Sequence, residues 1–190
     1  MNLNTIFFIG PQGSGKGTQA KLLAKTLGFF YWEMGGILRE VAKEDSELGR
    51  DVKNLIDQGI LLEDELLLRV VKSRLTQISP DQGVVFDGIP RRLGQAEFLL
   101  DFLKNQGRKD LATLFVNIPR EESITRLLQR AKIENRQDDT LEAIETRLKY
   151  YEHETLPVVE FLKQHTQFFE IDGLPPIEEV TNIIKQTVEV

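Results

Sequence analysis

The sequence predicts an α/β domain in three layers, with a five-stranded parallel sheet covered by helices on both faces. Three observations predict this class. Short apolar runs of strand-forming residues alternate with segments of helical periodicity. A glycine-rich turn directly follows the first of these runs. The 190 residues, 41% of them hydrophobic, suffice for one packed core with a small insertion but not for two full domains.

Five apolar runs are the expected strands: TIFFI (5–9), FFYW (29–32), VVFD (84–87), TLFVNI (113–118) and FFEI (168–171). The FFYW run, which contains Trp32, could instead be a base-stacking platform, although a buried strand is the favoured interpretation. Residues 35–78 carry three helical patterns without a strand, which predicts an insertion standing off the sheet. Residues 131–139 are polar without periodicity, so we expect an exposed loop there. Pro157 is expected to kink or interrupt the long helix after Thr140.

Composition excludes several classes of function. The net charge of -6 disfavours non-specific binding to nucleic acid or an anionic membrane, because both begin with phosphate neutralisation. The chain has no cysteine, so it has no disulfide framework, no thiol catalysis and no cysteine zinc site. The first apolar run is about five residues, far below the roughly 18 that span a bilayer. We therefore expect no targeting segment and an intracellular, cytoplasmic protein.

The strongest chemical signal is IFFIGPQGSGKGTQA, an apolar strand followed by a glycine-rich turn and a helix. Three glycines, Gly10, Gly13 and Gly15, would allow positive φ and let backbone amides converge on an anion at a helix start. A glycine cluster alone is usually a simple turn. The added Lys16 and Thr18 at this spacing predict a phosphate-binding loop, although Gly17 stands where the general pattern has Ser or Thr.

The run VVFD ends in a carboxylate, Asp87. Ligands of parallel sheets bind at the carboxyl ends of the strands, so we expect Asp87 to lie beside the phosphate-binding loop. There it could hold Mg²⁺ through water, because Mg²⁺ retains several of its own waters in proteins. The alternative is that Asp87 merely caps the turn before Gly88.

Taken together and in order, the motifs resemble those of the nucleoside monophosphate kinases, and most closely those of adenylate kinases. They are GSGKGTQA, GGILRE, SELG, DQGILLEDEL, DGIPRRLGQA, RLLQR, NRQDD and RLKYYEHETLPVVEF, which span nearly the whole chain. The resemblance implies a single P-loop kinase domain over residues 1–190, with an NMP-binding insertion at about 33–62 and a short lid at about 130–139. It also implies reversible transfer of the ATP γ-phosphoryl group to AMP, giving two ADP, with Mg²⁺ bound to ATP and no zinc.

The resemblance further implies roles for individual residues. Catalytic roles would fall to Lys16, Arg91, Arg130, Arg136 and Arg147. The ATP site would comprise Gly13, Ser14, Gly15, Lys16, Gly17, Thr18, Arg126, Arg130 and Gly173. The AMP site would comprise Met34, Gly35, Arg39, Ile60, Leu61, Leu62, Gly88, Arg91, Gln95, Arg136 and Arg147. Metal binding would involve Asp87, with Thr18 as a second candidate ligand.

The arginines have a shared physical reason. Two nucleotides are polyanions that repel each other, so a site that brings them together needs fixed cations. Any one arginine alone would more often be a solvated surface charge. Within the lid, Asp138 and Asp139 could hold arginines on closure, or Asp139 with Glu142 could form a helix capping box. The resemblance also implies a cis bond between Ile89 and Pro90.

One stretch departs from the family pattern. YWEMGGILRE starts a helix without a Ser, Thr, Asp or Asn cap, and Met34, Gly35 and Gly36 stand where the family usually has Thr-Gly-Asp. We interpret the two glycines as leaving room for a ligand or water at the helix amides. Base recognition would then depend on Gln95, whose amide can pair with the adenine edge.

Three other functions remain open from sequence. A P-loop kinase of another small molecule is disfavoured because such enzymes usually keep Ser or Thr at the position of Gly17. A UMP or CMP kinase is disfavoured because it tends to have Asn in place of Gln95. The third is a catalytically weak module that binds ATP or AMP as a regulatory signal. For the favoured enzyme we expect a monomer whose partners are ATP and AMP, without nucleic acid or membrane.

Overall fold

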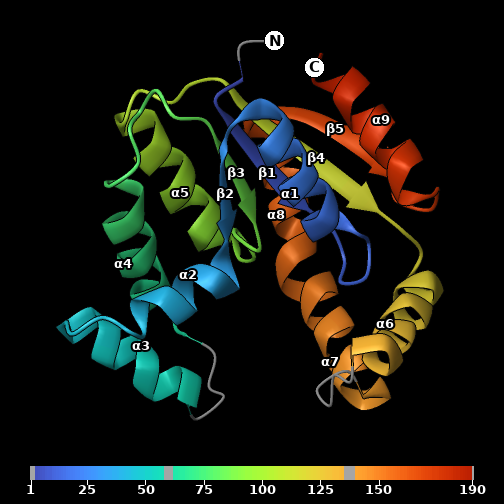
Figure 1. Cartoon of the computed structure of the whole chain (residues 1–190), viewed down its shortest axis with the longest axis horizontal. Helices are drawn as coiled ribbons and strands as arrows, with labels where there is room; N and C mark the ends of the chain where they lie inside the picture. Colours follow the sequence, from blue (N-terminus) through green and yellow to red (C-terminus); the bar gives the residue numbers. More distant parts are fainter. Residues whose placement is uncertain (1–2, 58–61, 135–139, 190) are drawn as a thin grey trace.

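The computed structural model describes residues 3–57, 62–134 and 140–189. Its sheet has five strands, β1 (Thr5–Ile9), β2 (Phe30–Glu33), β3 (Val84–Asp87), β4 (Leu111–Asn117) and β5 (Gln167–Asp172). All neighbouring strands are parallel and the order is β2-β3-β1-β4-β5 (Figure 1). The predicted α/β class with a five-stranded parallel sheet is confirmed. Each predicted strand is present, with boundaries that differ by at most two residues.

The helices of the described chain alternate with these strands. They are α1 (Lys16–Leu27), α2 (Met34–Val41), α3 (Glu47–Asp57), α4 (Asp64–Leu75), α5 (Leu93–Asn105), α6 (Arg120–Glu134), α7 (Leu141–Tyr150), α8 (Leu156–His165) and α9 (Ile177–Thr187). A π-helical turn, η1 (Tyr151–Thr155), joins α7 to α8. In the described parts of the chain, no helix is both long and apolar enough to cross a bilayer.

The sheet is buried on both faces, as alternation along β1 shows. Phe7 and Ile9 belong to the larger core, which includes residues of α4, α5 and α8. Ile6 and Phe8 point the other way, into a second core with residues of α1 and α9. Successive side chains of a strand face opposite sides, so a strand covered on both faces is apolar throughout. This explains why TIFFI has no polar alternation.

The aromatic run before α2 is a buried strand, as predicted. Trp32 is fully buried in β2 and its ring lies 5.4 Å from that of Phe86 in β3. Aromatic side chains bury large areas and stabilise cores, so Trp32 contributes to packing and offers no surface for stacking a base. The base-platform alternative is therefore wrong for this residue.

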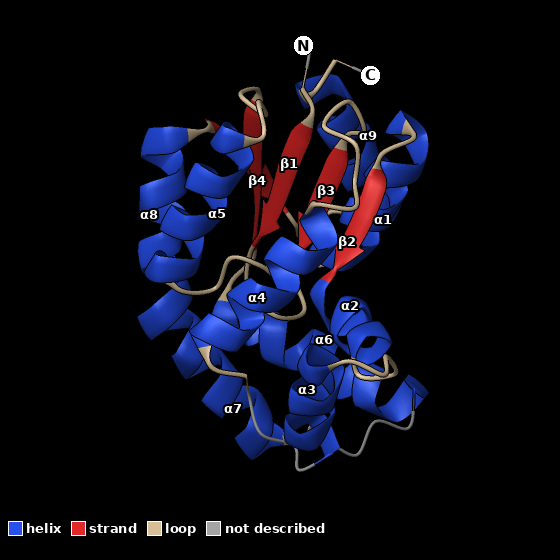
Figure 2. Cartoon of the chain, turned by 90° about the vertical axis from the view of Figure 1, so that its left-hand side faces the viewer, coloured by secondary structure: helices blue, strands red, loops and turns tan. Residues whose placement is uncertain are grey.

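The expected insertion of three helices needs a correction. Of these three helices, only α2 and α3 project beyond the carboxyl ends of the strands, where α6 and α7 form a second projection (Figure 1 and Figure 2). The helix α4 instead packs against α5, and its Val70, Val71 and Leu75 are fully buried in the larger core, to which Val41 of α2 and Val52 of α3 also belong. Helical periodicity shows that α4 has an apolar face but not which neighbour covers it, so the sequence did not separate α4 from the insertion.

The predicted polar loop at 131–139 is partly helical. The helix α6 continues to Glu134, and residues 135–139 lie outside the described part of the chain. Ala131, Lys132 and Glu134 are good helix formers, and their intrinsic propensity extends the helix despite the lack of an apolar face. The helix α7 begins after Thr140, whose side chain accepts a 3.2 Å bond from the Ala143 amide. The observed N-cap is thus Thr140 and not Asp139.

The interruption expected at Pro157 is present. The π-helical turn at 151–155 ends where α8 begins, and Pro157 lies in the first turn of α8. Proline lacks an amide hydrogen and clashes with the preceding turn, so it is tolerated best at a helix start. The bond between Ile89 and Pro90 is cis, as the family resemblance implied.

At the opposite end of the sheet, Arg108 joins two segments that precede strands, the residue before β1 and the loop before β3. Its side chain is 1% exposed. It donates to the carbonyl oxygens of Gln82 and Ser79, both at 2.7 Å, and of Asn4 at 3.4 Å. A buried guanidinium that satisfies several carbonyls is costly to truncate, because those carbonyls are then left unsatisfied.

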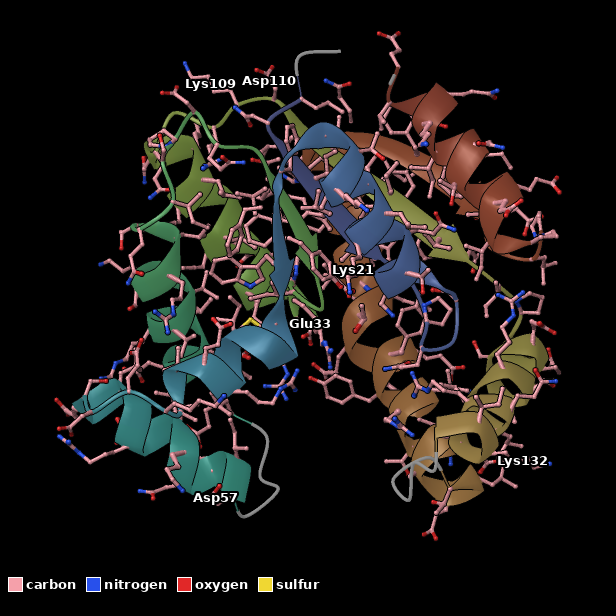
Figure 3. The ribbon with its side chains drawn as sticks, in the orientation of Figure 1. Lys21, Glu33, Asp57, Lys109, Asp110 and Lys132 are labelled. Carbon is pink, nitrogen blue, oxygen red and sulfur yellow. The ribbon has the colours of Figure 1, made fainter. Side chains whose placement is uncertain are left out.

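We predict that Arg108→Ala lowers the free energy of unfolding by about 2–3 kcal/mol without changing turnover, because a fully buried side chain and its hydrogen bonds to three carbonyls are lost far from the site. Urea unfolding and steady-state kinetics measure the two effects. Lys109→Ala is the control, since this exposed neighbour lies at the same end of the molecule (Figure 3). A stability loss no larger than that of the control would contradict the assignment.

Candidate active site

Most of the predicted site residues gather around one cavity of about 380 Å³. It lies at the carboxyl ends of β1, β2 and β3, at the base of the two helical projections. The predicted residues that line it are Gly13, Gly15, Lys16, Gly17, Thr18, Met34, Gly35, Asp87, Gly88, Arg91, Arg126 and Arg130. A larger hollow of about 580 Å³ between α2 and the end of α4 is lined by none of the predicted residues. The 380 Å³ cavity, called the central cavity below, is therefore the candidate site.

The glycine-rich loop between β1 and α1 has the conformation that the sequence predicts. Gly10, Gly13 and Gly15 all have positive φ. Gly15 is the N-cap of α1 at φ 84° and has no side chain that could occupy the helix start. The first amides of α1 therefore point toward the central cavity without a side-chain cap, which is the arrangement that binds phosphate groups.

Lys16 begins α1 and its ammonium group lies beneath the loop, where Nζ donates to the Pro11 carbonyl at 3.1 Å. Burial lowers the pKa of Lys16 from 10.5 to about 8, while the Asp87 carboxylate raises it. Arg91 and Arg130 lower it further through like-charge repulsion. The lysine thus loses its proton more readily than a solvated lysine, and an incoming phosphate would stabilise its charged form.

Asp87 and the start of α1 are in close contact. A Cβ atom at position 17 would lie 2.9 Å from Asp87 Oδ2, so Gly17 is required by the carboxylate and not by backbone conformation. The Tyr31 hydroxyl donates to the same Oδ2 at 3.0 Å. Burial raises the pKa of Tyr31, and the adjacent Asp87 carboxylate raises it further, so the hydroxyl keeps its proton as a donor.

These groups fit a magnesium ion bound with a nucleotide. Among the described residues, no three His, Cys, Asp or Glu side chains are grouped so that they could hold a metal. Mg²⁺ needs no such group, because one or two protein oxygens, substrate phosphates and waters complete its octahedron. Asp87 and Thr18 both line the central cavity beside the phosphate-binding loop, and both offer oxygen ligands.

Arg91 is held by its backbone, which leaves its guanidinium at the cavity. Its amide donates to Gln95 Oε1 at 2.9 Å, and its carbonyl accepts from the Thr155 hydroxyl at 3.1 Å. Its Nε donates to the Gly88 carbonyl at 2.9 Å. Thr155 belongs to the π-helical turn, so this turn fixes the loop that carries the arginine. Such turns often occur at functional sites.

Gln95 is buried in the structure, and both ends of its amide are occupied. Besides accepting from Arg91, it donates through Nε2 to Asp64 Oδ1 at 2.6 Å. Asp64 also pairs with Arg92 at 3.3 Å, and the Tyr150 hydroxyl accepts from Arg92 at 2.7 Å. In this arrangement Gln95 positions Arg91. The sequence did not indicate either of these partners.

A second hollow, of about 440 Å³, adjoins the central cavity and is called the donor hollow below. The two share Gly13, Gly15, Thr18 and Arg126. Arg126 donates to the carbonyls of Gly173 at 2.9 Å and Leu174 at 3.2 Å, and it pairs with Glu122. The other lining residues include the predicted Ser14 and Gly173 and the apolar Pro175, Pro176 and Ile177.

Besides Gln95 and the two residues of the donor hollow, Ser14 and Gly173, three described residues of the predicted site do not line the central cavity. Arg39 pairs with Glu33 on the projection formed by α2 and α3. The Arg147 Nε donates to the Ala143 carbonyl at 3.2 Å within α7. Leu62 packs against the edge of the larger core. The predicted Ile60, Leu61 and Arg136 lie outside the described residues, as do Asp138 and Asp139.

Sequence reasoning missed four residues that shape the site: Tyr31, Glu33, Asp64 and Thr155. Tyr31 and Glu33 are two residues apart on β2, so they lie on one face of the strand. Glu33 is paired in register with Asp87. Placing β2 beside β3 would have indicated these two. Nothing in the sequence indicated that Asp64 and Thr155 would contact Gln95 and Arg91.

Comparison with known proteins agrees with this geometry. The family model described as "Adenylate kinase" matches residues 8–167. The adenylate kinase of Phocaeicola vulgatus is 37% identical over 187 residues, which are 98% of each chain. That of Parabacteroides distasonis is 38% identical over 98% of this chain and 97% of its own. That of Thermus thermophilus is 38% identical over 92% of this chain and 91% of its own. Given these matches across the site and the fold, the chain belongs to the adenylate kinase family.

Proposed function

We propose that this chain catalyses the reversible, Mg²⁺-dependent transfer of the γ-phosphoryl group from ATP to AMP, giving two ADP. The observation that carries the proposal is the meeting of Lys16, Asp87 and Arg91 with Arg126 and Arg130 around one cavity. Phosphoryl transfer requires position and positive charge more than covalent chemistry from the protein. The names of the relatives favour AMP over UMP or CMP as the acceptor.

The proposed donor site is the phosphate-binding loop together with the donor hollow. The uncapped amides of α1 and the Lys16 ammonium would hold the β and γ phosphates. The donor hollow shares Arg126 with the central cavity, and its proline and isoleucine side chains offer apolar area for the adenine ring. Gly13, Ser14, Gly15, Gly17, Thr18 and Gly173 complete this site.

The proposed acceptor site lies on the other side of the central cavity. Arg91 and Arg39 would bind the AMP phosphate, with Met34, Gly35, Gly88 and Leu62 nearby and Ile60 and Leu61 beyond the described residues. Gln95 would support Arg91 and, after exchanging partners, the base. The acceptor phosphate is already anionic, so no general base is required.

Arg130, Arg136 and Arg147 would surround the transferring group once the projection formed by α6 and α7 closes, since adenylate kinase lids are known to close on substrate. Closure has a chemical purpose: water excluded from the γ-phosphate cannot hydrolyse ATP. Mg²⁺ bound with ATP, near Asp87 and Thr18, would neutralise phosphate charge. One chain supplies all of these groups, which supports a monomer, and the family resemblance supports a cytoplasmic location.

The proposal predicts that the purified protein forms ADP from ATP and AMP with Mg²⁺, and that Arg91→Ala lowers kcat/KM by about 10³-fold or more because the acceptor phosphate loses a fixed cation. A coupled ADP assay with AMP, dAMP, CMP, UMP and GMP measures activity and acceptor choice. Thermal melting is the control, since the Arg91 side chain bonds locally, from Nε to the Gly88 carbonyl, and its loss should change stability little. Nucleotide binding without turnover would refute the enzyme.

A second prediction concerns pH. Lys16 in the free protein has a pKa of about 8, and phosphate binding favours its charged form, so ATP affinity should fall as pH rises above 8. Binding measured between pH 7 and 9.5 tests this. Lys16→Arg is the control, because a guanidinium stays charged and should flatten the profile. An unchanged slope in that variant would contradict the role of Lys16.

The lowered pKa of Lys16 has the opposite effect on the free energy of unfolding, which should increase with pH while ATP affinity falls. Between about pH 8 and 10.5 the unfolded chain holds the Lys16 proton more tightly than the folded protein, so stability without ligand should rise across this window.

A further prediction concerns the hydroxyl of Tyr31, which orients Asp87. Tyr31→Phe should raise the Mg²⁺ concentration needed for half-maximal ATP binding by about three- to tenfold, because the hydroxyl acts only by orienting Asp87, so metal binding loses only part of the roughly 1.5–3 kcal/mol of a hydrogen bond to a charged group. Calorimetric titration of ATP at several Mg²⁺ concentrations measures it. Tyr150→Phe is matched, since it removes a tyrosine hydroxyl bonded to Arg92 instead. Equal Mg²⁺ dependence in both variants would contradict the assignment.

A further inference from the structure

Glu33 holds a position that neither the phosphate-binding motif nor the fold requires. It ends β2, is the N-cap of α2, and lines the central cavity. Figure 3 labels it at the junction of strand and helix, where the projection formed by α2 and α3 leaves the sheet. Its carboxylate makes no capping bond to the helix amides. Instead, Oε2 accepts from Arg39 Nη2 at 3.2 Å, across the first turn of α2.

Gly35 and Gly36 of α2 leave the space that the Glu33 carboxylate occupies. A Cβ atom at Gly35 would lie 2.7 Å from Glu33 Oε1, and one at Gly36 would lie 2.7 Å from Glu33 Oε2. Both oxygens therefore pack against bare α-carbons, and any side chain at either position would displace them. In the structure the space beside the two glycines holds the Glu33 carboxylate, so a ligand that approaches the helix amides there would have to displace it.

The ion pair has a consequence for ligand binding. Arg39 offers its guanidinium to an internal carboxylate when no ligand is bound, and a phosphate that binds Arg39 would have to replace Glu33 or repel it. We propose that Glu33 is an internal competitor of the acceptor phosphate at Arg39 and that it lowers the affinity of the site for AMP. This inference rests on the proposed role of Arg39 in binding the acceptor.

We expect Glu33→Gln to change the affinity for AMP only a little, and the direction of the change decides which role Glu33 has. The side chains of Arg39 and Glu33 are 64% and 42% exposed, and exposed ion pairs contribute little. Glu33→Gln keeps the shape and removes the charge, so the Kd and KM for AMP should fall about two- to fivefold. If Glu33 instead held Arg39 in the geometry that binds phosphate, the same variant would weaken AMP binding. The KM for ATP should not change in either case.

The experiment is calorimetric binding of AMP, with KM values for AMP and ATP, in the full-length protein. Four variants are compared: Glu33→Gln, Arg39→Gln, the double variant, and Glu40→Gln. Glu40 is an exposed glutamate on the same helix that does not line the central cavity, so it controls for the change in net charge. Tighter AMP binding in Glu33→Gln, absent in Glu40→Gln and lost when Arg39→Gln is added, is the expected result.

The experiment distinguishes failure of the acceptor role of Arg39 from failure of the proposed competition by Glu33. If Arg39→Gln leaves AMP binding unchanged, the acceptor role of Arg39 fails, and the inference fails with it. If Arg39→Gln weakens binding while Glu33→Gln leaves it unchanged or weaker, the acceptor site stands and competition by Glu33 is overturned. If AMP binding is still tighter when Glu33→Gln is added to Arg39→Gln, competition by Glu33 is also overturned, because the effect would then not act through Arg39.

Discussion

The contact between Asp87 and the first turn of α1 is the constraint on which the site depends. Parallel pairing aligns Asp87 with Phe8 of β1, just before the phosphate-binding loop, so the carboxylate faces the start of the next helix. Gly17 allows this approach, and Tyr31 fixes the carboxylate from the other neighbouring strand. The sheet register thereby places the Asp87 carboxylate and Lys16 on the lining of the same cavity. The Cβ atom of a Ser or Thr at position 17 would clash with the Asp87 carboxylate and move it away from Lys16. This explains why Gly17 stands where the general loop pattern has Ser or Thr.

A second principle is that neutral contacts position the charged groups. Gln95 accepts from the Arg91 amide and the Thr155 hydroxyl donates to the Arg91 carbonyl, which fixes the backbone, while Arg91 Nε adds one bond to the Gly88 carbonyl. Thr155 lies in the π-helical turn between α7 and α8. Its hydrogen bond therefore connects the loop that carries Arg91 to the continuous helical segment α7–α8, which also carries Arg147. Preorganised charges need no rearrangement at the moment of reaction, and that is where electrostatic catalysis gains most.

Local patterns predicted much of this arrangement, and contacts between distant segments account for the rest. Strand periodicity, the glycine-rich loop and the strand-end Asp87 could be read because each depends on neighbours in sequence. The packing of α4 on the core, the engagement of Gln95 by Asp64 and the carboxylate over Gly35 could not. Each depends on which helices and strands pack together in space, and hydrophobic periodicity does not show which elements do so. Arg136 was predicted from the family motif alone and lies outside the described residues.

The cations of the site have internal carboxylates close by. Arg39 pairs with Glu33, Arg92 with Asp64 and Arg126 with Glu122, while Asp87 offsets the burial of Lys16. A cluster of uncompensated cations would repel one another in the free protein and destabilise the fold. Exposed pairs of this kind are weak, so a polyanionic nucleotide can replace the carboxylates at small cost. The acidic net charge of -6 is therefore compatible with a site for polyanions, because part of the acidic charge balances the cations of this site.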